Sequence, residues 1–529
     1  MINPLGGKRA IAGLAAVAFA LCSVVVARSH FVVDGRPQFT LIDDAMISMR
    51  YARNLARGDG LVWNVGEPPI EGFTNLGYTL LMVPGFALGD GLLSRYLPVL
   101  LTISGFVATV LITVAIARAI WPSSRTVPVA AGAMVALNFG LIFWSARGME
   151  VPLVTAAVLG MTLMYIRWRE SRIPRQLWLG AICGAVAVTL RMDALAVVLA
   201  VAAWLIASER LAGRSVRRTL IAVAVPSVAC IVILAFQGLY FGDPLPNTYR
   251  LKVEGVSAID RILVGLHVLI RNAAPELFVL LLLGPVLLAY HSRQMLRNAN
   301  VVVLGLIAAV SVGYSIWVGG DYAEPEVHAP NRFILVGIPG LCILAAGGSA
   351  AAIRQLFPAP RSRAVALGAT VVAVATILAP NFYNLGQLVL GDIPLLRSDN
   401  SKAAFAIRAH KILLPDTTIA SHPAGQLPYY TDLRHIDLLG KSDRRVATMP
   451  QAAKQFRPGH SKWDYDYSIG TLKPDVVVGD GFGESRPYLE SHGGYTRLPN
   501  GVWVSNAPRV PIDVKALSGL CWMNCKGKN

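Results

Sequence analysis

Charged residues are scarce in this chain. Only 15% of its 529 residues are Asp, Glu, Lys or Arg, whereas 54% are hydrophobic. A soluble globular domain has about 25% charged residues. The scarcity therefore excludes an ordinary soluble protein and predicts a chain that crosses a membrane several times.

Acidic residues are the scarcer of the two charge types. The chain has 31 Asp and Glu against 48 Lys and Arg, which gives a net charge of +17. Such an excess can indicate nucleic-acid binding, but no basic block here is interleaved with aromatic residues. In a membrane protein, basic residues collect in cytoplasmic loops. We therefore expect the lipid bilayer, and no nucleic acid, as a partner.

Cysteine is also rare, and four of the six cysteines lie inside apolar runs. The other two, Cys521 and Cys525, stand four positions apart near the C-terminus. A zinc site needs more ligands than this pair supplies. The two cysteines can form a short-range disulfide, or they can stay unpaired in a frayed C-terminal tail.

Six short basic clusters punctuate the apolar runs of the first two thirds of the chain, at residues 8–9, 118–125, 167–175, 208–218, 291–298 and 354–363. If all six are cytoplasmic, every second connector faces outward. This alternation gives about eleven transmembrane helices, with the N-terminus in the cytoplasm, provided that residues 77–89 do not cross the membrane. This predicts a polytopic α-helical membrane module over residues 1–380, with a large first outer loop at about 29–95.

The composition changes after Pro380, where polar residues increase and no further span is visible. "RSDNSKAAFAIRAHKILL" has helical spacing, with Asp399 or Ser401 as its N-cap. "TTIAS" and "PDVVVGD" have the pattern of buried strands. Residues 381–529 are therefore expected to form a small extracytoplasmic α/β domain.

Two adjacent carboxylates, Asp43 and Asp44, follow the first apolar run closely. Placing two carboxylates beside a membrane costs free energy unless they form ion pairs, bind a metal or take part in catalysis. One of them can instead cap the helix that "DDAMISMRYARNLARG" predicts, which ends at Gly58 or Gly60. A cap needs only one of the two acids, so Asp44 and Asp43 are candidate catalytic residues, with Asp43 the likelier cap.

The other outward connectors hold most of the remaining unusual polar residues. Arginine and lysine suit an anionic substrate such as a phosphate, although Arg191 and Asp193 can simply pair with each other. The acids among them, with Asp43 and Asp44, could hold one hard divalent cation, but no cofactor is assigned. The candidate substrate-binding residues are Arg50, Glu150, Arg191, Asp193, Asn247, Lys252, Asp321, His328 and Arg332.

Six motifs stand out along the chain: "DDAMISMRYARNLARGDGLVWNVGEPPIEGFTN", "GMEVPL", "RMDAL", "YFGDPLPNTYRLKV", "WVGGDYAEPEVHAPNRF" and "AGQLPYYTDLRHIDLLGKSD". They resemble motifs of the GT-C superfamily of integral membrane glycosyltransferases, and in particular of the bacterial family that includes mycobacterial terminal arabinofuranosyltransferases. Together they cover most of the chain in order.

The resemblance implies an enzyme of the bacterial cytoplasmic membrane that takes a sugar from a polyprenyl-phosphate donor. A pentose such as arabinofuranose is the sugar it suggests, and a cell-envelope glycan or glycolipid is the acceptor. The first-loop acid, Asp43 or Asp44, is then the expected base. The alternative is a transporter or flippase of lipid-linked sugars, which would show repeat halves and ionisable residues near the midplane.

Overall fold

The computed structural model describes residues 4–291, 293–321, 329–357, 359, 379–391, 394–480 and 484–522. The chain forms two compact units, each assembled from separate stretches of sequence. Unit 1 contains residues 1–25, 99–233 and 262–392, and unit 2 contains residues 26–98, 234–261 and 393–529. Most of the first long loop therefore belongs to the same unit as the C-terminal segment.

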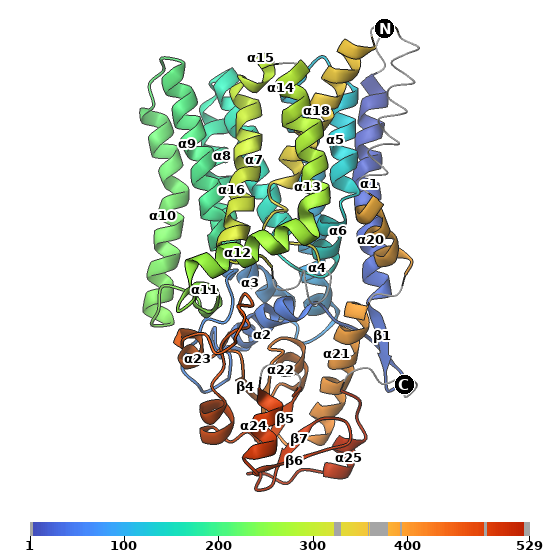
Figure 1. The fold of residues 1–529 in the computed structure, drawn as a ribbon, viewed down its shortest axis with the longest axis vertical. Coiled ribbons are helices and arrows are strands. Elements are labelled where there is room, and N and C mark those ends of the chain that lie inside the picture. Colours follow the sequence, from blue (N-terminus) through green and yellow to red (C-terminus); the bar gives the residue numbers. More distant parts are fainter. Residues whose placement is uncertain are drawn as a thin grey trace. The chain divides into compact units, whose positions relative to one another are not determined.

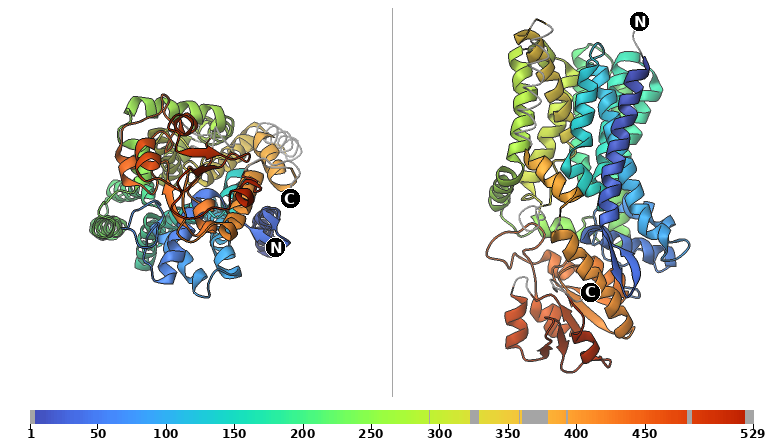
Figure 2. Two further views of the ribbon diagram at one scale, coloured as in Figure 1. Left: turned by 90° about the horizontal axis from the view of Figure 1, so that it is seen from below. Right: turned by 90° about the vertical axis from the view of Figure 1, so that its right-hand side faces the viewer.

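Unit 1 is built from helices, and its long helices run side by side in Figure 1 and in the right-hand view of Figure 2. The tightest pairing is between α7 and α8, and α16 packs on both α9 and α18. The helices that lie wholly or largely in this unit are α1 (Pro4–Arg28), α4 (Leu92–Ile120), α5 (Thr126–Ala136), α6 (Phe139–Ala146), α7 (Val151–Ser171), α8 (Pro174–Leu190), η2 (Met192–Ala194), α9 (Leu195–Leu211), α10 (Arg217–Tyr240), α12 (Ala258–Val268), η3 (Leu269–Ala273), α13 (Ala274–Leu281), η4 (Leu282–Val286), α14 (Leu287–His291), α15 (Arg293–Leu296), α16 (Ala299–Trp317), α18 (Ile338–Leu356) and α20 (Ala379–Val389).

Six helices in the described ranges are long and apolar enough to span a bilayer, or seven if the bent pair α5 and α6 is one span. The chain is thus a multi-pass membrane protein, but the predicted count of about eleven is not confirmed. Some apolar segments are too short or too broken: α8 has 17 residues, and η4 interrupts the path from α13 to α14. The segment predicted not to cross forms the short pieces α3 and η1 (Leu76–Phe86), which are too short for a span.

Unit 2 has a five-stranded sheet in the order β4-β3-β5-β7-β6. The first three strands in that order are parallel, and β7 is antiparallel to both β5 and β6. Its elements are β1 (His30–Val33), β2 (Arg36–Phe39), α2 (Asp43–Arg57), α3 (Leu76–Met82), η1 (Val83–Phe86), α11 (Asn247–Val253), α21 (Pro394–Ile412), β3 (Thr418–Ser421), α22 (Gln426–Thr431), β4 (Arg434–Asp437), α23 (Arg444–Thr448), η5 (Asp466–Thr471), β5 (Val476–Val478), α24 (Ser485–Ser491), β6 (Tyr495–Arg497), β7 (Trp503–Ser505) and α25 (Val514–Ser518).

Both faces of this sheet are covered, which explains the continuous apolar strands β3 and β5 that the sequence predicts. Ile419 and Val476 pack with Phe405 of α21 on one face. Ala420 and Val477, the next residues along the same strands, join a second cluster on the other face. The predicted helix is present as α21 but begins at Pro394. The predicted N-caps at Asp399 and Ser401 are therefore wrong, because both positions are inside the helix.

The amphipathic helix α2 carries the paired acids in its first turn and is buried from Ala45 to Asn54. Its apolar side, with Ile47 and Tyr51, packs on Trp63 and Phe73 of the following loop. It ends at Gly58, whose φ of 91° is easy only for glycine. The predicted C-terminus is thus confirmed, and a compact first loop holds the start of α2 in place.

Candidate functional site

Asp43 is held by the backbone of the C-terminal segment of unit 2. Its carboxylate accepts hydrogen bonds at 3.0–3.1 Å from the backbone amides of residues 424–426, at the start of α22. The approach is close, since a Cβ on Gly425 would lie 1.9 Å from the carbonyl oxygen of Asp43. Burial raises the pKa of Asp43, and the charges of Lys441 and Lys402 oppose that effect. Asp43 therefore acts as an anchor of the fold.

The predicted helix cap is wrong in its details. The N-cap of α2 is Ile42, and no side chain caps it. Both Asp43 and Asp44 are inside the first turn, where a carboxylate is favoured by the helix dipole. Asp43 meets the amides at the start of a different helix, 381 to 383 positions away in sequence.

Asp44 is partly exposed and forms an ion pair with Lys441. Its side chain is 33% exposed, and its Oδ1 lies 3.0 Å from Nζ of Lys441. The side chain of Lys441 is only 13% exposed. Burial alone would lower the pKa of Lys441, but Asp44 and Asp43 more than compensate, so that the pKa is raised. The pair thus places a charged ammonium against a partly exposed carboxylate.

The loop that carries Lys441 is fixed by a second buried acid, Asp437, at the end of β4. Its carboxylate accepts hydrogen bonds from the backbone amides of Leu439, Gly440 and Ser442 at 2.8–3.2 Å. Burial raises the pKa of Asp437 to about 6, and these amides oppose the rise. From the other side, Gly72 approaches so closely that a Cβ there would lie 3.2 Å from the carbonyl oxygen of Lys441. Sequence reasoning missed Lys441, although "GKSD" is part of a motif quoted above.

His460 lies close enough to this pair to feel both of its charges. Desolvation, and then the charge of Lys441, lower the pKa of His460 to about 3, while Asp44 acts in the opposite direction. Its Nδ1 lies 3.0 Å from the carbonyl oxygen of Pro458, and Lys252 of α11 adds a further positive charge nearby. The imidazole is therefore neutral at physiological pH and does not repel Lys441.

Arg50 is a structural residue in this fold. The residue is 3% exposed, and its guanidinium donates to the carbonyl oxygens of Trp63, Leu433 and Pro428 and to the side chain of Asn64. These protein groups occupy the guanidinium. Substrate binding by Arg50 stays a prediction, and these contacts favour a structural role for this residue.

Asn247 lies at the start of α11, next to a buried acid that sequence reasoning also missed. The backbone amide of Asn247 donates to the carbonyl oxygen of Glu71 at 3.3 Å. Glu71 is 4% exposed, and its carboxyl group accepts a hydrogen bond from Gln237 at 2.7 Å. Desolvation raises the pKa of Glu71 to about 8. Nothing in "PPIEGFTN" shows that this acid is buried, so no sequence signal could have singled it out.

The remaining described candidates form two ion-pair groups in unit 1. Arg191 donates to Glu150 at 2.8 Å and to Asp193 at 2.9 Å, so the expected pairing of Arg191 with Asp193 is confirmed. Nε of Arg332 lies 3.0 Å from Asp321. Both arginines are thus already matched by carboxylates, and the first group carries a net negative charge. His328 lies outside the described residues.

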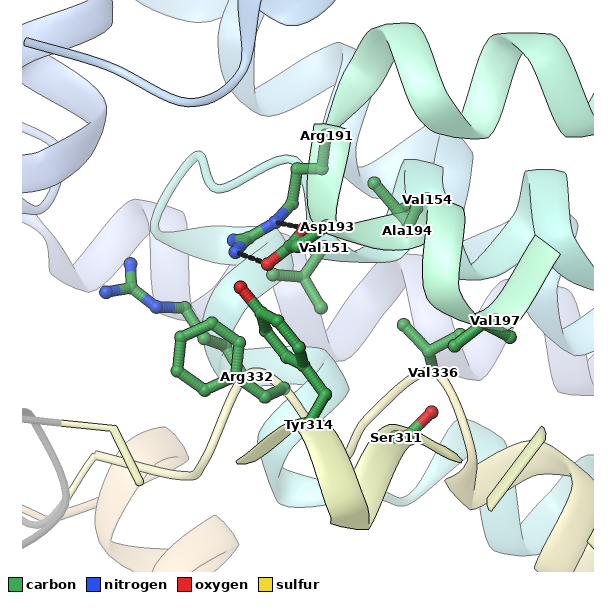
Figure 3. A pocket seen from close by; sticks show the side chains of 11 residues that line it. Val151, Val154, Arg191, Asp193, Ala194, Val197, Ser311, Tyr314, Arg332 and Val336 are labelled. Atoms are coloured by element: carbon green, nitrogen blue, oxygen red, sulfur yellow. Dashed lines mark hydrogen bonds and ion pairs between the residues drawn. The ribbon is translucent and has the colours of Figure 1, made fainter. Parts of the chain in front are cut away.

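A small pocket of about 30 Å³ in unit 1 is lined by members of both groups. Figure 3 shows Arg191 and Asp193 joined at its edge, with the hydroxyl group of Tyr314 directed toward them and Arg332 to one side. The rest of the lining is mainly aliphatic, including Val151 and Val197. The space suffices for about one or two water molecules. Among the residues that the structure describes, no cluster of three His, Cys, Asp or Glu side chains could hold a metal ion.

Comparison with known proteins finds similarity in structure far more than in sequence. Residues 397–511 match a family described as "Domain of unknown function (DUF8728)". No curated protein sequence matches the chain.

Two groups of solved structures share the architecture. ArnT from Cupriavidus metallidurans, bound to undecaprenyl phosphate, is 13% identical with a TM-score of 0.55, over 94% of this chain and 98% of that one. The oligosaccharyltransferase of Archaeoglobus fulgidus in its apo form is 11% identical with a TM-score of 0.57, over 96% of this chain and 75% of that one. Both belong to the GT-C superfamily of membrane glycosyltransferases. The chain therefore has the GT-C fold.

Proposed function

We propose that this protein is a membrane glycosyltransferase that uses a polyprenyl-phosphate-linked sugar, with Asp44 as the general base. The observation that carries the proposal is the difference between the two adjacent acids. The carboxylate of Asp43 is engaged by three backbone amides, whereas the side chain of Asp44 is one-third exposed and pairs with the ammonium of Lys441. Asp44 therefore combines partial exposure with a neighbouring cation, whereas the carboxylate of Asp43 is taken up by the backbone.

The fold supports a lipid-phosphate donor. ArnT of similar architecture was solved with undecaprenyl phosphate, and the archaeal oligosaccharyltransferase AglB with dolichol-phosphate. By analogy, this chain would bind a sugar attached to such a phosphate. A donor of this kind needs no nucleotide outside the cytoplasm, and we predict from the basic connectors that the first outer loop lies there.

The chemistry follows from general-base catalysis. Asp44 takes the proton of an acceptor hydroxyl group, and the acceptor oxygen forms a bond to the anomeric carbon of the donor sugar. The bond between that carbon and the phosphate oxygen breaks, and its electron pair leaves with the polyprenyl phosphate. The candidates for substrate binding remain Arg50, Lys252, Asn247, Glu150, Arg191, Asp193, Asp321, His328 and Arg332. We assign no ligands to a divalent cation.

We further propose that the sugar is a pentose such as arabinofuranose and that the acceptor is a cell-envelope glycan or glycolipid. Both follow from the motif resemblance alone. The same resemblance, with the basic connectors, suggests a bacterial cytoplasmic membrane, with the N-terminus inside and the C-terminal segment outside.

The test is donor cleavage by the purified protein in detergent. Polyprenyl-phosphoryl arabinofuranose is supplied first and then other polyprenyl-phosphoryl pentoses and hexoses, and released polyprenyl phosphate is measured. We expect cleavage that depends on an added acceptor. A transporter or flippase would leave every donor intact, because detergent offers no second compartment. That result would overturn the proposed function.

A further inference from the structure

We propose that Lys441 is a positioning residue that keeps the carboxylate of Asp44 charged and fixed in direction. The residue comes from the segment matching the domain of unknown function, which thereby forms part of the active centre. This inference rests on the proposed function, since it assigns a role to Lys441 through the base Asp44.

The position of Lys441 leaves it little freedom. Its loop is anchored at one end by Asp437, which binds three of the loop's backbone amides. Gly440, just before it, has a φ of 82°, and a Cβ there would lie 2.8 Å from Val446. Gly72 closes the other side. A lysine on so constrained a backbone can direct its ammonium much better than a lysine on a mobile surface loop.

Three carboxylates and one neutral ring act on or near the ammonium. Asp43 and Asp44 belong to α2 and Asp437 to β4. The neutral ring is His460, and Lys252 adds a positive charge near that ring. Two of the three carboxylates are already satisfied by backbone amides. Asp44 instead takes the ammonium at 3.0 Å. The ammonium therefore serves Asp44 in particular.

A positioning role differs from phosphate binding in what its loss would change. If Lys441 holds Asp44 ionised, its removal makes Asp44 take up a proton at higher pH, because an opposite charge within about 4–6 Å favours the ionised form. If Lys441 instead binds the donor phosphate, its removal weakens binding of the lipid. Undecaprenyl phosphate, which carries no sugar, separates these two effects.

The experiment compares Lys441→Met and Lys441→Arg with the wild type, and uses Lys454→Met as a control on an exposed lysine of the same segment. The pH dependence of kcat/KM is measured for cleavage of polyprenyl-phosphoryl arabinofuranose, or of whichever donor the wild type cleaves. Binding of undecaprenyl phosphate is measured separately at neutral pH.

For Lys441→Met we expect the acid side of the pH–rate profile to move to higher pH by about one unit or more, which is a tenfold or greater loss at low pH. Lys441→Arg should restore most of the profile, and undecaprenyl phosphate should bind all three variants as it binds the wild type. An unchanged profile, or a loss of lipid binding in Lys441→Met, would overturn this inference. A wild type that cleaves no donor would instead overturn the proposed function on which it rests.

Discussion

Asp44 and Lys441, which are 397 positions apart in the chain, form an ion pair with 3.0 Å between the carboxylate and the ammonium. The neighbouring Asp43 has a different role, because backbone amides of the same C-terminal segment hold its carboxylate. The two adjacent acids thus differ in what surrounds them.

Asp43→Ala should destabilise the protein by about 1–3 kcal/mol, because the amides of residues 424–426 lose their acceptor. Asp43→Asn keeps an acceptor oxygen at the same place and should cost less. Thermal unfolding in detergent measures both, with the exposed Asp416→Ala as the control. Equal unfolding temperatures for wild type and Asp43→Ala would contradict the anchoring role.

Gly425→Ala should be strongly destabilising, because its Cβ would lie 1.9 Å from a backbone oxygen of Asp43. Overpacking of this kind costs about 1–3 kcal/mol or more. Gly494→Ala is the matched control, since its Cβ would meet nothing within 4 Å. A normal yield and unfolding temperature for Gly425→Ala would show that α2 and α22 do not meet as described.

Glu71→Gln should abolish one component of the pH dependence of stability. The pKa of Glu71 is raised from 4.5 in its ordinary state to about 8 in the fold. Between these values the folded protein holds a proton that the unfolded chain has lost, so stability falls as the pH rises from about 4.5 to 8 and is constant above that. Glutamine mimics the protonated acid and is insensitive to pH.

The two proteins should therefore unfold at similar temperatures at pH 4.5, and Glu71→Gln should be the more stable at pH 8.5. We expect a difference of at least a few degrees, since about 1 kcal/mol corresponds to about 2–4 °C in a domain of 150–250 residues. If the difference in unfolding temperature between the wild type and Glu71→Gln stays constant from pH 4.5 to 8.5, Glu71 is ionised in the fold.

Much of this arrangement can be predicted from local sequence patterns. The acidic start and glycine end of α2, the apolar strands β3 and β5, and the Arg191–Asp193 pair all depend on residues close together in the chain. The partners of Asp43 and Asp44 could not be predicted, because they come from positions more than 380 residues away. Arg50 shows a similar limit: as a cation it suggested binding of an anionic substrate, and the sequence did not show that its donors contact protein carbonyl groups.

The predicted orientation can be tested by labelling in intact cells. In a variant without the native cysteines, Val65→Cys and Ala87→Cys should both react with an impermeant maleimide, because both positions are exposed and belong to the outer loop that we predict. Arg214→Cys, in a basic connector, should react only after the membrane is permeabilised. Labelling of Ala87→Cys from the inside would break the topology.

Sugar transfer by Asp44→Asn tests the central claim most directly. The substitution preserves shape and removes only the charge and basicity of Asp44, and loss of a general base lowers the rate by about 10² to 10⁴. At matched amounts of folded protein, we predict that Asp44→Asn binds undecaprenyl phosphate like the wild type but transfers sugar at least about 100-fold more slowly. Transfer at a near-normal rate by Asp44→Asn would contradict the account.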